Sequence, residues 1–162
     1  MEAVKQFFVD LPIPVWLKAL IASMIPLLES RYAILFFMNG DIPFGWLFLI
    51  SVIGNLIPVP IIMLLFRPII EMLKKTKLLS KFAHSLEGST NKKAKKVLKY
   101  KYFGLLIFVA IPAPGTGAIS GACVASILNL RISRALPLIF LGTVIATAIT
   151  TGGWSILTEI FI

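Results

Sequence analysis

Ile111-Pro112-Ala113-Pro114-Gly115-Thr116-Gly117-Ala118 separates two apolar runs, at 103–111 and 118–128. As helices, runs of about 10 residues are about 15 Å long, whereas the hydrocarbon core of a bilayer is about 30 Å thick. The two prolines and two glycines between the runs do not allow one continuous helix. The stretch therefore predicts a re-entrant hairpin: a half-helix enters the bilayer, the chain breaks near its middle, and a second half-helix returns.

The composition is that of an integral membrane protein. Hydrophobic residues make up 58% of the 162 residues and charged residues only 14%, so a soluble fold would expose too much apolar surface. We expect one membrane domain over 1–162. In such a protein the formal net charge of +9 indicates membrane topology rather than a nucleic-acid partner.

A second interruption of the same kind lies near the start of the chain. Pro12 and Pro14 introduce a predicted helix over 15–28, in keeping with the preference of proline for a first turn. The polar stretch Glu29-Ser30-Arg31 follows, and a shorter apolar piece covers 32–38. The order of helix, polar break and shorter helix predicts another hairpin.

Each predicted hairpin precedes a stretch that is long enough to cross the membrane once. The first span covers 45–66, with a kink expected where glycine, asparagine and two prolines occur together (Gly54, Asn55, Pro58 and Pro60). The second covers 135–149 and continues toward 162, with a weak point at Gly152-Gly153.

The two halves are therefore predicted to be repeats, at about 12–66 and about 102–157. Aligning Pro26 with Pro112 brings Gly54 close to Gly142. Because each unit of hairpin plus span crosses the bilayer once, consecutive units must have opposite orientations, as in many transporters. The expected fold is an all-α membrane protein made of two inverted repeats.

The basic residues predict the orientation. The segment 67–101 holds eleven of the sixteen Lys and Arg residues, and Arg131 and Arg134 add two on the same predicted face. Basic loops remain in the cytoplasm, so we expect a multi-pass protein of the cell membrane with both termini outside. Apolar residues at helical spacing in 67–101 predict amphipathic helices on the membrane surface, near anionic lipid headgroups.

Glu29 and Arg31 are the charged pair placed between apolar runs. A charge in hydrocarbon costs about 2.5–3.5 kcal/mol on insertion scales, so such residues face an interior or a cavity. The functional interpretation is that Glu29 takes up a coupling proton while Arg31 binds an anion. The alternative is a salt bridge that only fixes the hairpin turn.

The second hairpin loop is the other candidate substrate or ion site. The helix that starts near Gly117 would direct its positive end at the break, which suits a phosphate or carboxylate. The glycines alternatively serve close helix packing. The residues concerned are Pro112, Pro114, Gly115, Thr116 and Gly117, with Asn55 as a weaker candidate that is otherwise hydrogen-bonded to a neighbouring helix.

Arg131 and Arg134 set topology or, alternatively, guide an anion at the cytoplasmic entrance. His84 and Cys123, far apart in the chain, do not form a metal site. The sequence contains neither a nucleophile with its base nor a Walker-type or Rossmann phosphate loop. We therefore expect no cofactor, no metal and no enzymatic activity.

Two motifs resemble a known family. Glu29-Ser30-Arg31-Tyr32-Ala33-Ile34 resembles an E-x-R-x-A-I/L motif, and the run from Pro112 to Gly121 resembles the P-x-P-G-T-G-A-x-x-G motif, of the putative small multidrug export protein family. That family is similar to the DedA/VTT membrane proteins. The resemblance implies two re-entrant hairpins that face each other, and a role in lipid scrambling, polyprenyl-phosphate flipping or proton-dependent transport.

Together these observations predict a transporter or flippase for an amphipathic anion of lipid-phosphate type, with proton coupling at Glu29. One alternative is the export of small molecules or drugs. Another is a non-transporting scaffold whose lysines recruit anionic lipid or a partner protein. Because two spans and two hairpins bury little surface, we also expect a homo-oligomer.

Overall fold

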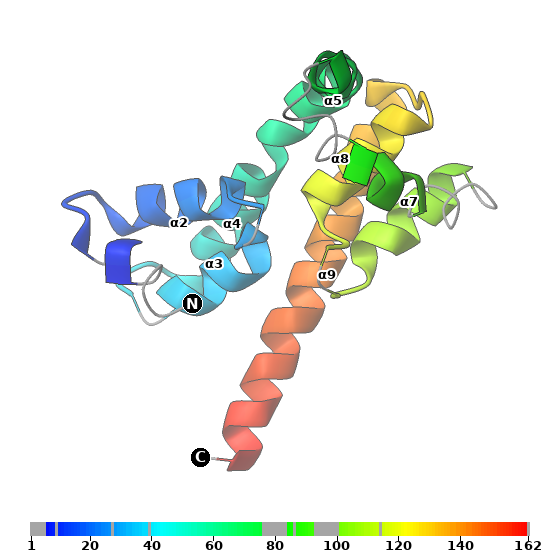
Figure 1. The fold of residues 1–162 in the computed structure, drawn as a ribbon. Coiled ribbons are helices and arrows are strands. Elements are labelled where there is room, and N and C mark those ends of the chain that lie inside the picture. The colour runs from blue at the N-terminus through cyan, green and yellow to red at the C-terminus, as the bar shows by residue number, and fades with distance from the viewer. Residues whose placement is uncertain are drawn as a thin grey trace.

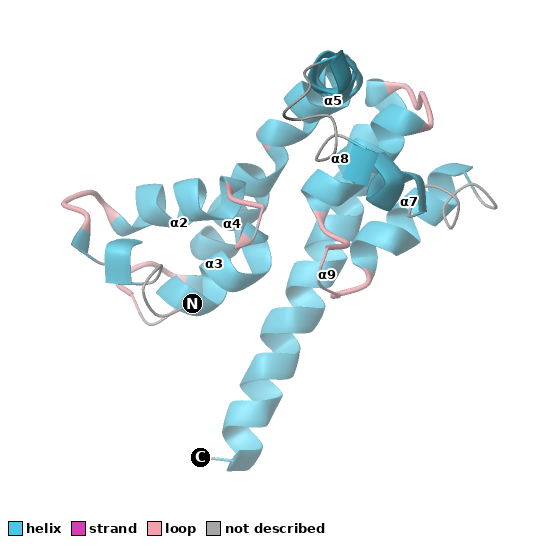
Figure 2. Ribbon diagram, in the orientation of Figure 1, coloured by secondary structure: helices cyan, strands magenta, loops and turns pink. Residues whose placement is uncertain are grey.

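The computed structural model of the chain describes residues 6–8, 10–26, 28–38, 40–75, 84–85, 87–92, 101–113 and 115–161. Figure 2 shows only helices and connecting loops in this part of the chain, which confirms the all-helical expectation. Two short helical hairpins lie on opposite sides of the long helices (Figure 1).

The first hairpin consists of α2 (Val15–Met24) and α3 (Glu29–Phe37). The predicted end of α2 at 28 is wrong, because the residue before a proline disfavours the helical conformation. Ile25, which precedes Pro26, has extended φ −80° and ψ 129°. At 10 and 9 residues, the two helices are each about 15 Å long.

The first long helix consists of α4 (Phe44–Leu56) and α5 (Pro58–Lys75), joined by a turn at Ile57. The kink predicted near Pro58 is confirmed at this turn, since a proline has no N–H to donate to the carbonyl four residues earlier. The 29 residues Phe44–Met72 are apolar and long enough to cross a membrane.

The second hairpin consists of α7 (Lys101–Ala110) and α8 (Ala118–Ile127), which match the two predicted apolar runs. It leads into the longest helix, α9 (Ile132–Phe161), whose first 22 residues are also long and apolar enough to span. α9 continues through Gly152-Gly153, so the predicted weak point does not interrupt the helix. Two glycines cost only about 2 kcal/mol relative to alanine in a helix.

The two halves of the chain pack in the same way. α2 and α3 pack on α4, and α7 packs on α9, so each hairpin contacts the long helix that follows it. In addition, α3 packs on α9 and α8 packs on α5. The second helix of each hairpin therefore also contacts the long helix of the other half.

Glycines allow both hairpins to approach their long helices closely. A Cβ added to Gly54 on α4 would lie 2.5 Å from the Leu20 carbonyl oxygen of α2. A Cβ added to Gly142 on α9 would lie 2.8 Å from Val109 Cβ and 3.1 Å from the Leu106 carbonyl oxygen of α7. Leu106 is the counterpart of Leu20 when Pro26 is aligned with Pro112.

The apolar core divides into two clusters. One is formed by the first hairpin, α4 and Phe8, and the other by α5 together with α7, α8 and α9. Buried polar side chains on α3, α4 and α9 lie outside both clusters; they are Glu29, Ser30, Arg31, Ser51, Asn55, Thr143, Thr147 and Thr151. The contact between the two halves thus has a polar component at the level of the hairpin loops.

The basic segment 67–101 is described only in part. α5 continues to Lys75, so the segment begins as the end of the long helix, and helical residues follow at 84–85 and 87–92. Most of the lysines, and the residues 76–83, 86 and 93–100 of the segment for which surface helices are predicted, lie outside the described residues.

Candidate functional site

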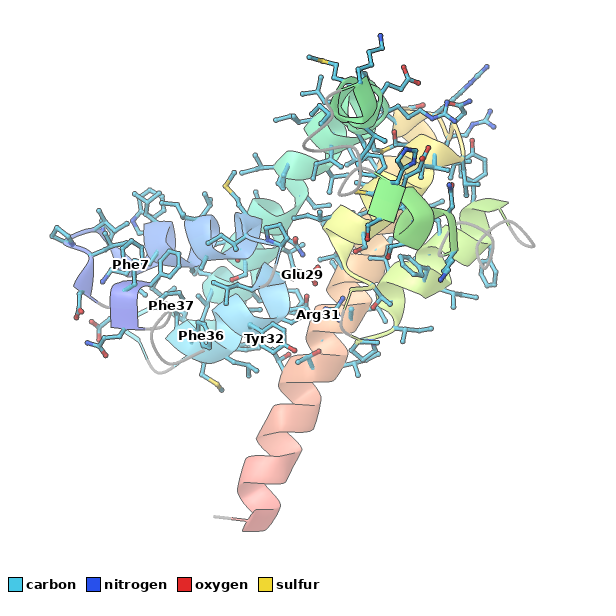
Figure 3. All side chains as sticks on the ribbon, in the orientation of Figure 1. Phe7, Glu29, Arg31, Tyr32, Phe36 and Phe37 are labelled. Atoms are coloured by element: carbon cyan, nitrogen blue, oxygen red, sulfur yellow. The ribbon has the colours of Figure 1, made fainter. Side chains whose placement is uncertain are left out.

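The loops of the two hairpins meet in a cavity of about 180 Å³. Its wall combines the start of α3, the loop after α7 and one residue of α9: Pro26, Glu29, Arg31, Tyr32, Pro112, Ala113, Gly115 and Thr150. Figure 3 shows Glu29 and Arg31 where the first hairpin faces the second half of the chain. The structure therefore brings together four predicted site residues that are far apart in the sequence: Glu29, Arg31, Pro112 and Gly115.

Glu29 is held in an unusual position. Only 8% of the residue is exposed, and its backbone has φ 49°, in the left-handed region that non-glycine residues rarely adopt. Strained residues of this kind occur most often at binding and switch sites. Gly115, the counterpart of Glu29 in the second hairpin loop, also has a positive φ, of 77°.

The Glu29 carboxylate lies against the beginning of α8. Gly117 is the N-cap residue of that helix, and a Cβ on it would overlap both carboxylate oxygens of Glu29. The first amide groups of a helix carry partial positive charge. The Glu29 carboxylate thus occupies the position at the start of α8 that the sequence suggested for an external anion. Gly117 leaves room for the carboxylate because glycine has no Cβ.

Arg31 also connects the two hairpins, through the Ala113 carbonyl of the second hairpin loop. Its Nη2 lies 3.4 Å from Glu29 Oε2, and its Nη1 donates a long hydrogen bond of 3.5 Å to the carbonyl of Ala113. Only 7% of Arg31 is exposed. The ion pair is therefore buried, and separating it without a replacement partner would be costly.

The second hairpin loop is held by its own hydrogen bonds. The Thr116 hydroxyl lies 2.7 Å from the carbonyl oxygens of both Ile111 and Ala113, and the Ala113 N–H donates to the Ile111 carbonyl. The Thr116 N–H donates to the Ala113 carbonyl. Thr116 therefore stabilises the turn, and the amides of Ala113 and Thr116 are already bonded. Pro114 lies outside the described residues.

Asn55 lies close to the place where the two hairpin loops meet, but it does not line the cavity there. Its Nδ2 donates to Ser30 Oγ at 3.2 Å, and the Ser30 hydroxyl shares a 2.8 Å hydrogen bond with Thr147 Oγ1 of α9. All three residues are at most 1% exposed. Because Ser30 lies between Glu29 and Arg31 in the sequence, this chain of hydrogen bonds fixes the start of α3 against both long helices.

Arg131 and Arg134 lie away from the cavity, at the beginning of α9, and both are exposed. The guanidinium carbon of Arg134 lies 6.0 Å from the centre of the Tyr102 ring, within the range of a cation–π contact. The structure thus does not bring these two arginines together with Glu29 and Arg31.

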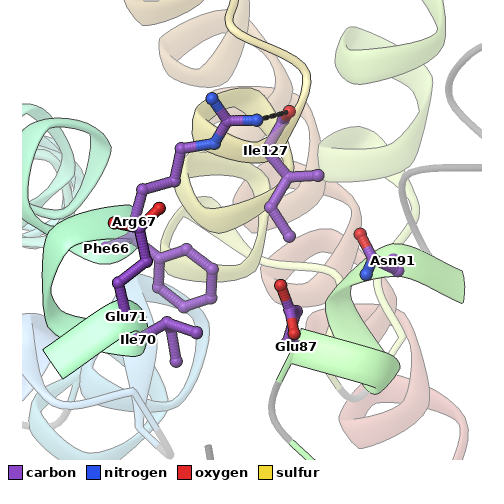
Figure 4. A pocket seen from close by; sticks show the side chains of 7 residues that line it. All are labelled: Phe66, Arg67, Ile70, Glu71, Glu87, Asn91 and Ile127. Carbon is purple, nitrogen blue, oxygen red and sulfur yellow. Dashed lines mark hydrogen bonds between the residues drawn. The ribbon is translucent and has the colours of Figure 1, made fainter. Parts of the chain in front are cut away.

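Arg67 has a role that the sequence analysis missed. Its Nη1 donates to Asn129 Oδ1 at 2.6 Å. Its Nη2 donates to the Ile127 carbonyl at 2.9 Å, a bond that Figure 4 shows. A cation is stabilising at this C-terminal end of α8. Asn129, at φ 53°, together with the 2.9 Å bond from the Leu130 N–H to the Ala125 carbonyl, gives the usual left-handed helix end.

Arg67 also lines a second, polar cavity of about 280 Å³ between the end of α5 and residues 87–91. The signal available in the sequence was the asparagine directly after an apolar helix, a common residue at a helix end. Tyr32 and Thr150, which line the first cavity, carried no signal in the sequence. Both lie in stretches that the sequence predicts as apolar helices.

One comparison with known proteins identifies a family. A family model described as putative small multi-drug export protein matches residues 29–149, which is most of the chain. In the other two comparisons, no curated protein and no solved structure matches the chain. The matched region includes all residues that line the first cavity except Pro26 and Thr150.

Proposed function

The chain belongs to the family of putative small multi-drug export proteins, and on that premise we propose that it is a transporter or flippase for an amphipathic anion. The substrate headgroup, of lipid-phosphate type, binds where the two hairpin loops meet. The observation that carries this proposal is the placement of one carboxylate, that of Glu29, against both a buried guanidinium and a helix N-terminus.

The geometry suggests how a proton and an anion bind together. While Glu29 is ionised, it contacts Arg31 and the start of α8, which are the groups best suited to a phosphate. A proton on Glu29 removes its charge and weakens both contacts, so that an external anion replaces the carboxylate. Proton and anion then favour each other's binding, which is the linkage that coupled transport requires.

Two similarities between the halves support an inverted repeat with re-entrant hairpins. Each hairpin loop has a residue of positive φ three positions after its proline, Glu29 after Pro26 and Gly115 after Pro112. Each long helix also receives its hairpin at a glycine. The hairpin helices of about 15 Å are half the thickness of the hydrocarbon core, whereas each long helix can cross it.

The contact of Arg67 with the end of α8 supports the proposed topology. Because Arg67 bonds to Ile127 and Asn129, the end of α5 and the end of the second hairpin lie on one face of the molecule. This is the face on which the proposal places 67–101 and the loop with Arg131 and Arg134, in the cytoplasm. Both termini then lie outside.

The test is transport by the purified protein in liposomes with an imposed pH gradient. Movement of a fluorescent anionic phospholipid between leaflets should depend on the gradient, and Glu29→Gln should abolish this dependence. Glu71→Gln is the matched control, because Glu71 is an exposed carboxylate outside the first cavity. Full gradient-dependent activity of Glu29→Gln would reject the proton role of this residue.

Export of small molecules or drugs is the second candidate function, and the family description favours it. An apolar groove of about 430 Å³ lies between the α4–α5 turn and α9, lined by Ile53, Leu56, Ile57, Pro60, Leu136, Pro137 and Phe140. Uptake of an uncharged dye into inverted vesicles, without movement of anionic lipid, would favour this function. Transport of neither probe would favour a scaffold that binds anionic lipid.

A homo-oligomer is part of the proposal. Large apolar side chains on α4 and α5 are exposed in the single chain, among them Trp46, Leu49, Leu64 and Met72, which are 51–69% exposed. Lipid covers part of such a surface, and a second copy of the chain covers the rest. Light scattering of the protein in detergent measures the mass, and a monomer would contradict this part.

A further inference from the structure

Three buried side-chain oxygens on α4 and α9, two helices that contact each other, stand out within the described part of the chain. Ser51 Oγ, Asn55 Oδ1 and Thr143 Oγ1 are fully enclosed and lack a hydrogen-bond partner there. Ser51 and Asn55 are one turn apart on α4, and Thr143 lies one turn from Thr147 on α9. Buried polar atoms are normally bonded, so three of them on two contacting helices call for a ligand.

Other buried hydroxyls, on α2 and α9, behave differently. Ser23 donates to the Ala19 carbonyl at 2.6 Å, and Thr151 donates to the Thr147 carbonyl at 2.9 Å. This bond to the carbonyl four residues earlier is the usual solution for a hydroxyl in an apolar helix. Ser51 and Thr143 make no such bond in the described structure, although the same kind of carbonyl precedes each of them.

Asn55 belongs to a cluster of neutral polar side chains with Ser30 and Thr147, and Ser51 and Thr143 each lie one helical turn from a member of this cluster. Ser30 Oγ lies 3.2 Å from Asn55 Nδ2 and 2.8 Å from Thr147 Oγ1, so Ser30 connects the α4 pair with the α9 pair. The Asn55 amide nitrogen donates to Ser30, so the Asn55 amide oxygen points away from Ser30. The five side chains are between 0% and 3% exposed, and they present oxygen atoms without a carboxylate.

Two backbone carbonyls next to Asn55 add to this set of oxygens. Gly54 and Leu56 have Pro58 and Pro60 four residues later, so neither carbonyl receives the usual helical N–H. Free carbonyls at a helix break are the groups that hold monovalent cations in many transporters.

We propose that Ser51, Asn55 and Thr143, with Ser30 and Thr147, form a binding site for a monovalent alkali cation. The neutral oxygens suit one positive charge, whereas Ca²⁺ and Mg²⁺ sites in proteins use carboxylates. A water molecule would also bond to these oxygens. The additional carbonyls of Gly54 and Leu56 favour the cation over the water, because a water molecule can donate only two hydrogen bonds.

The site would fix α3 where it meets the second half of the chain. Ser30 is a member of the cluster, and its neighbours Glu29 and Arg31 hold the hairpin junction. An effect of the cation on transport rests on the proposed function, whereas binding itself does not. Binding is therefore measured first, on protein that need not transport anything.

The experiment is thermal unfolding of the purified protein in detergent, followed by tryptophan fluorescence, in NaCl, KCl or N-methylglucamine chloride at equal ionic strength. For a site half-saturated at about 10 mM, 100 mM of the bound cation should raise Tm by about 3–6 °C relative to N-methylglucamine. The same Tm in all three salts would show that neither Na⁺ nor K⁺ binds to the folded protein at these concentrations, and would overturn the proposal.

Two Thr→Val variants, each of which keeps the shape of the side chain while removing its hydroxyl, localise the effect of the cation on Tm. Thr143→Val removes a hydroxyl that has no partner in the described structure, so it should leave Tm in N-methylglucamine unchanged or higher and should abolish the cation-dependent rise. Thr151→Val removes a hydroxyl bonded within its own helix and should keep the rise. A full cation-dependent rise in Thr143→Val would refute this site even if the protein binds a cation elsewhere.

Discussion

The substitution Gly117→Ala tests the hairpin junction most sharply. The backbone of Gly117 has φ −76° and ψ −169°, which alanine adopts freely. On conformational grounds alone, the change should stabilise the protein by about 0.4–1 kcal/mol. The added Cβ, however, would overlap both carboxylate oxygens of Glu29, so the carboxylate has to move away from α8.

The expected loss follows from the ion pair that this movement breaks. Glu29 and Arg31 are both buried, and leaving one partner of a buried pair without the other costs about 3–5 kcal/mol. Allowing for the conformational gain, Gly117→Ala should lower the free energy of unfolding by about 2–4 kcal/mol. For a chain of this size, that corresponds to a decrease in Tm of about 5–15 °C.

The control is the same substitution without the carboxylate. Glu29→Ala should itself destabilise, because Arg31 loses its partner, but adding Gly117→Ala to it should cost little further stability. Gly45→Ala is a second control, since a Cβ at Gly45 on α4 meets nothing within 4 Å, and it should be neutral or slightly stabilising. An equal loss from Gly117→Ala with and without Glu29 would refute the assigned contact.

Two further predictions concern helix ends and helix contacts. Arg67→Met removes both side-chain hydrogen bonds at the end of α8. It should lower the free energy of unfolding by about 1–2 kcal/mol, a value reduced because Arg67 is exposed. Arg131→Met, at another exposed arginine, is the control, and an equal Tm for the two variants would contradict the role of Arg67. Gly54→Ala should destabilise more than Gly142→Ala, because its Cβ meets a backbone carbonyl at 2.5 Å, whereas the Cβ at Gly142 first meets a side chain at 2.8 Å. Thermal unfolding measures both, and the reverse order would contradict the packing of α2 on α4.

The prolines and the chain order made much of the fold predictable. The end of α7, the turn between α4 and α5, and the short hairpin helices follow from where proline and glycine interrupt apolar runs, whereas the end of α2 was predicted four residues too late. Glu29 and Arg31 were identifiable because a charge between apolar runs needs a partner. These signals are local, and each can be read from a few neighbouring residues.

The partners of these residues were not predictable in the same way. The contact of Glu29 with Gly117 joins two loops that are distant in the sequence. Glycine has no side chain whose chemistry would indicate such a contact. The Arg67 bond to Asn129 likewise depends on how α5 and α8 pack. The unbonded hydroxyls of Ser51 and Thr143 resemble any other hydroxyl in an apolar helix until the neighbouring helix is in place.

The proposed fold requires that the second hairpin enters the membrane and returns without reaching the other side. Single cysteines at Tyr102, Gly115, Arg131 and Asp41, introduced into a Cys123→Ala background, can be labelled in oriented vesicles with a membrane-impermeant maleimide. We predict that positions 102 and 131 react from one face and position 41 from the other. Position 115 should stay protected from the face on which position 41 reacts. Rapid labelling of position 115 from that face, at the rate of position 41, would show that α7 and α8 cross the membrane, and would contradict the account.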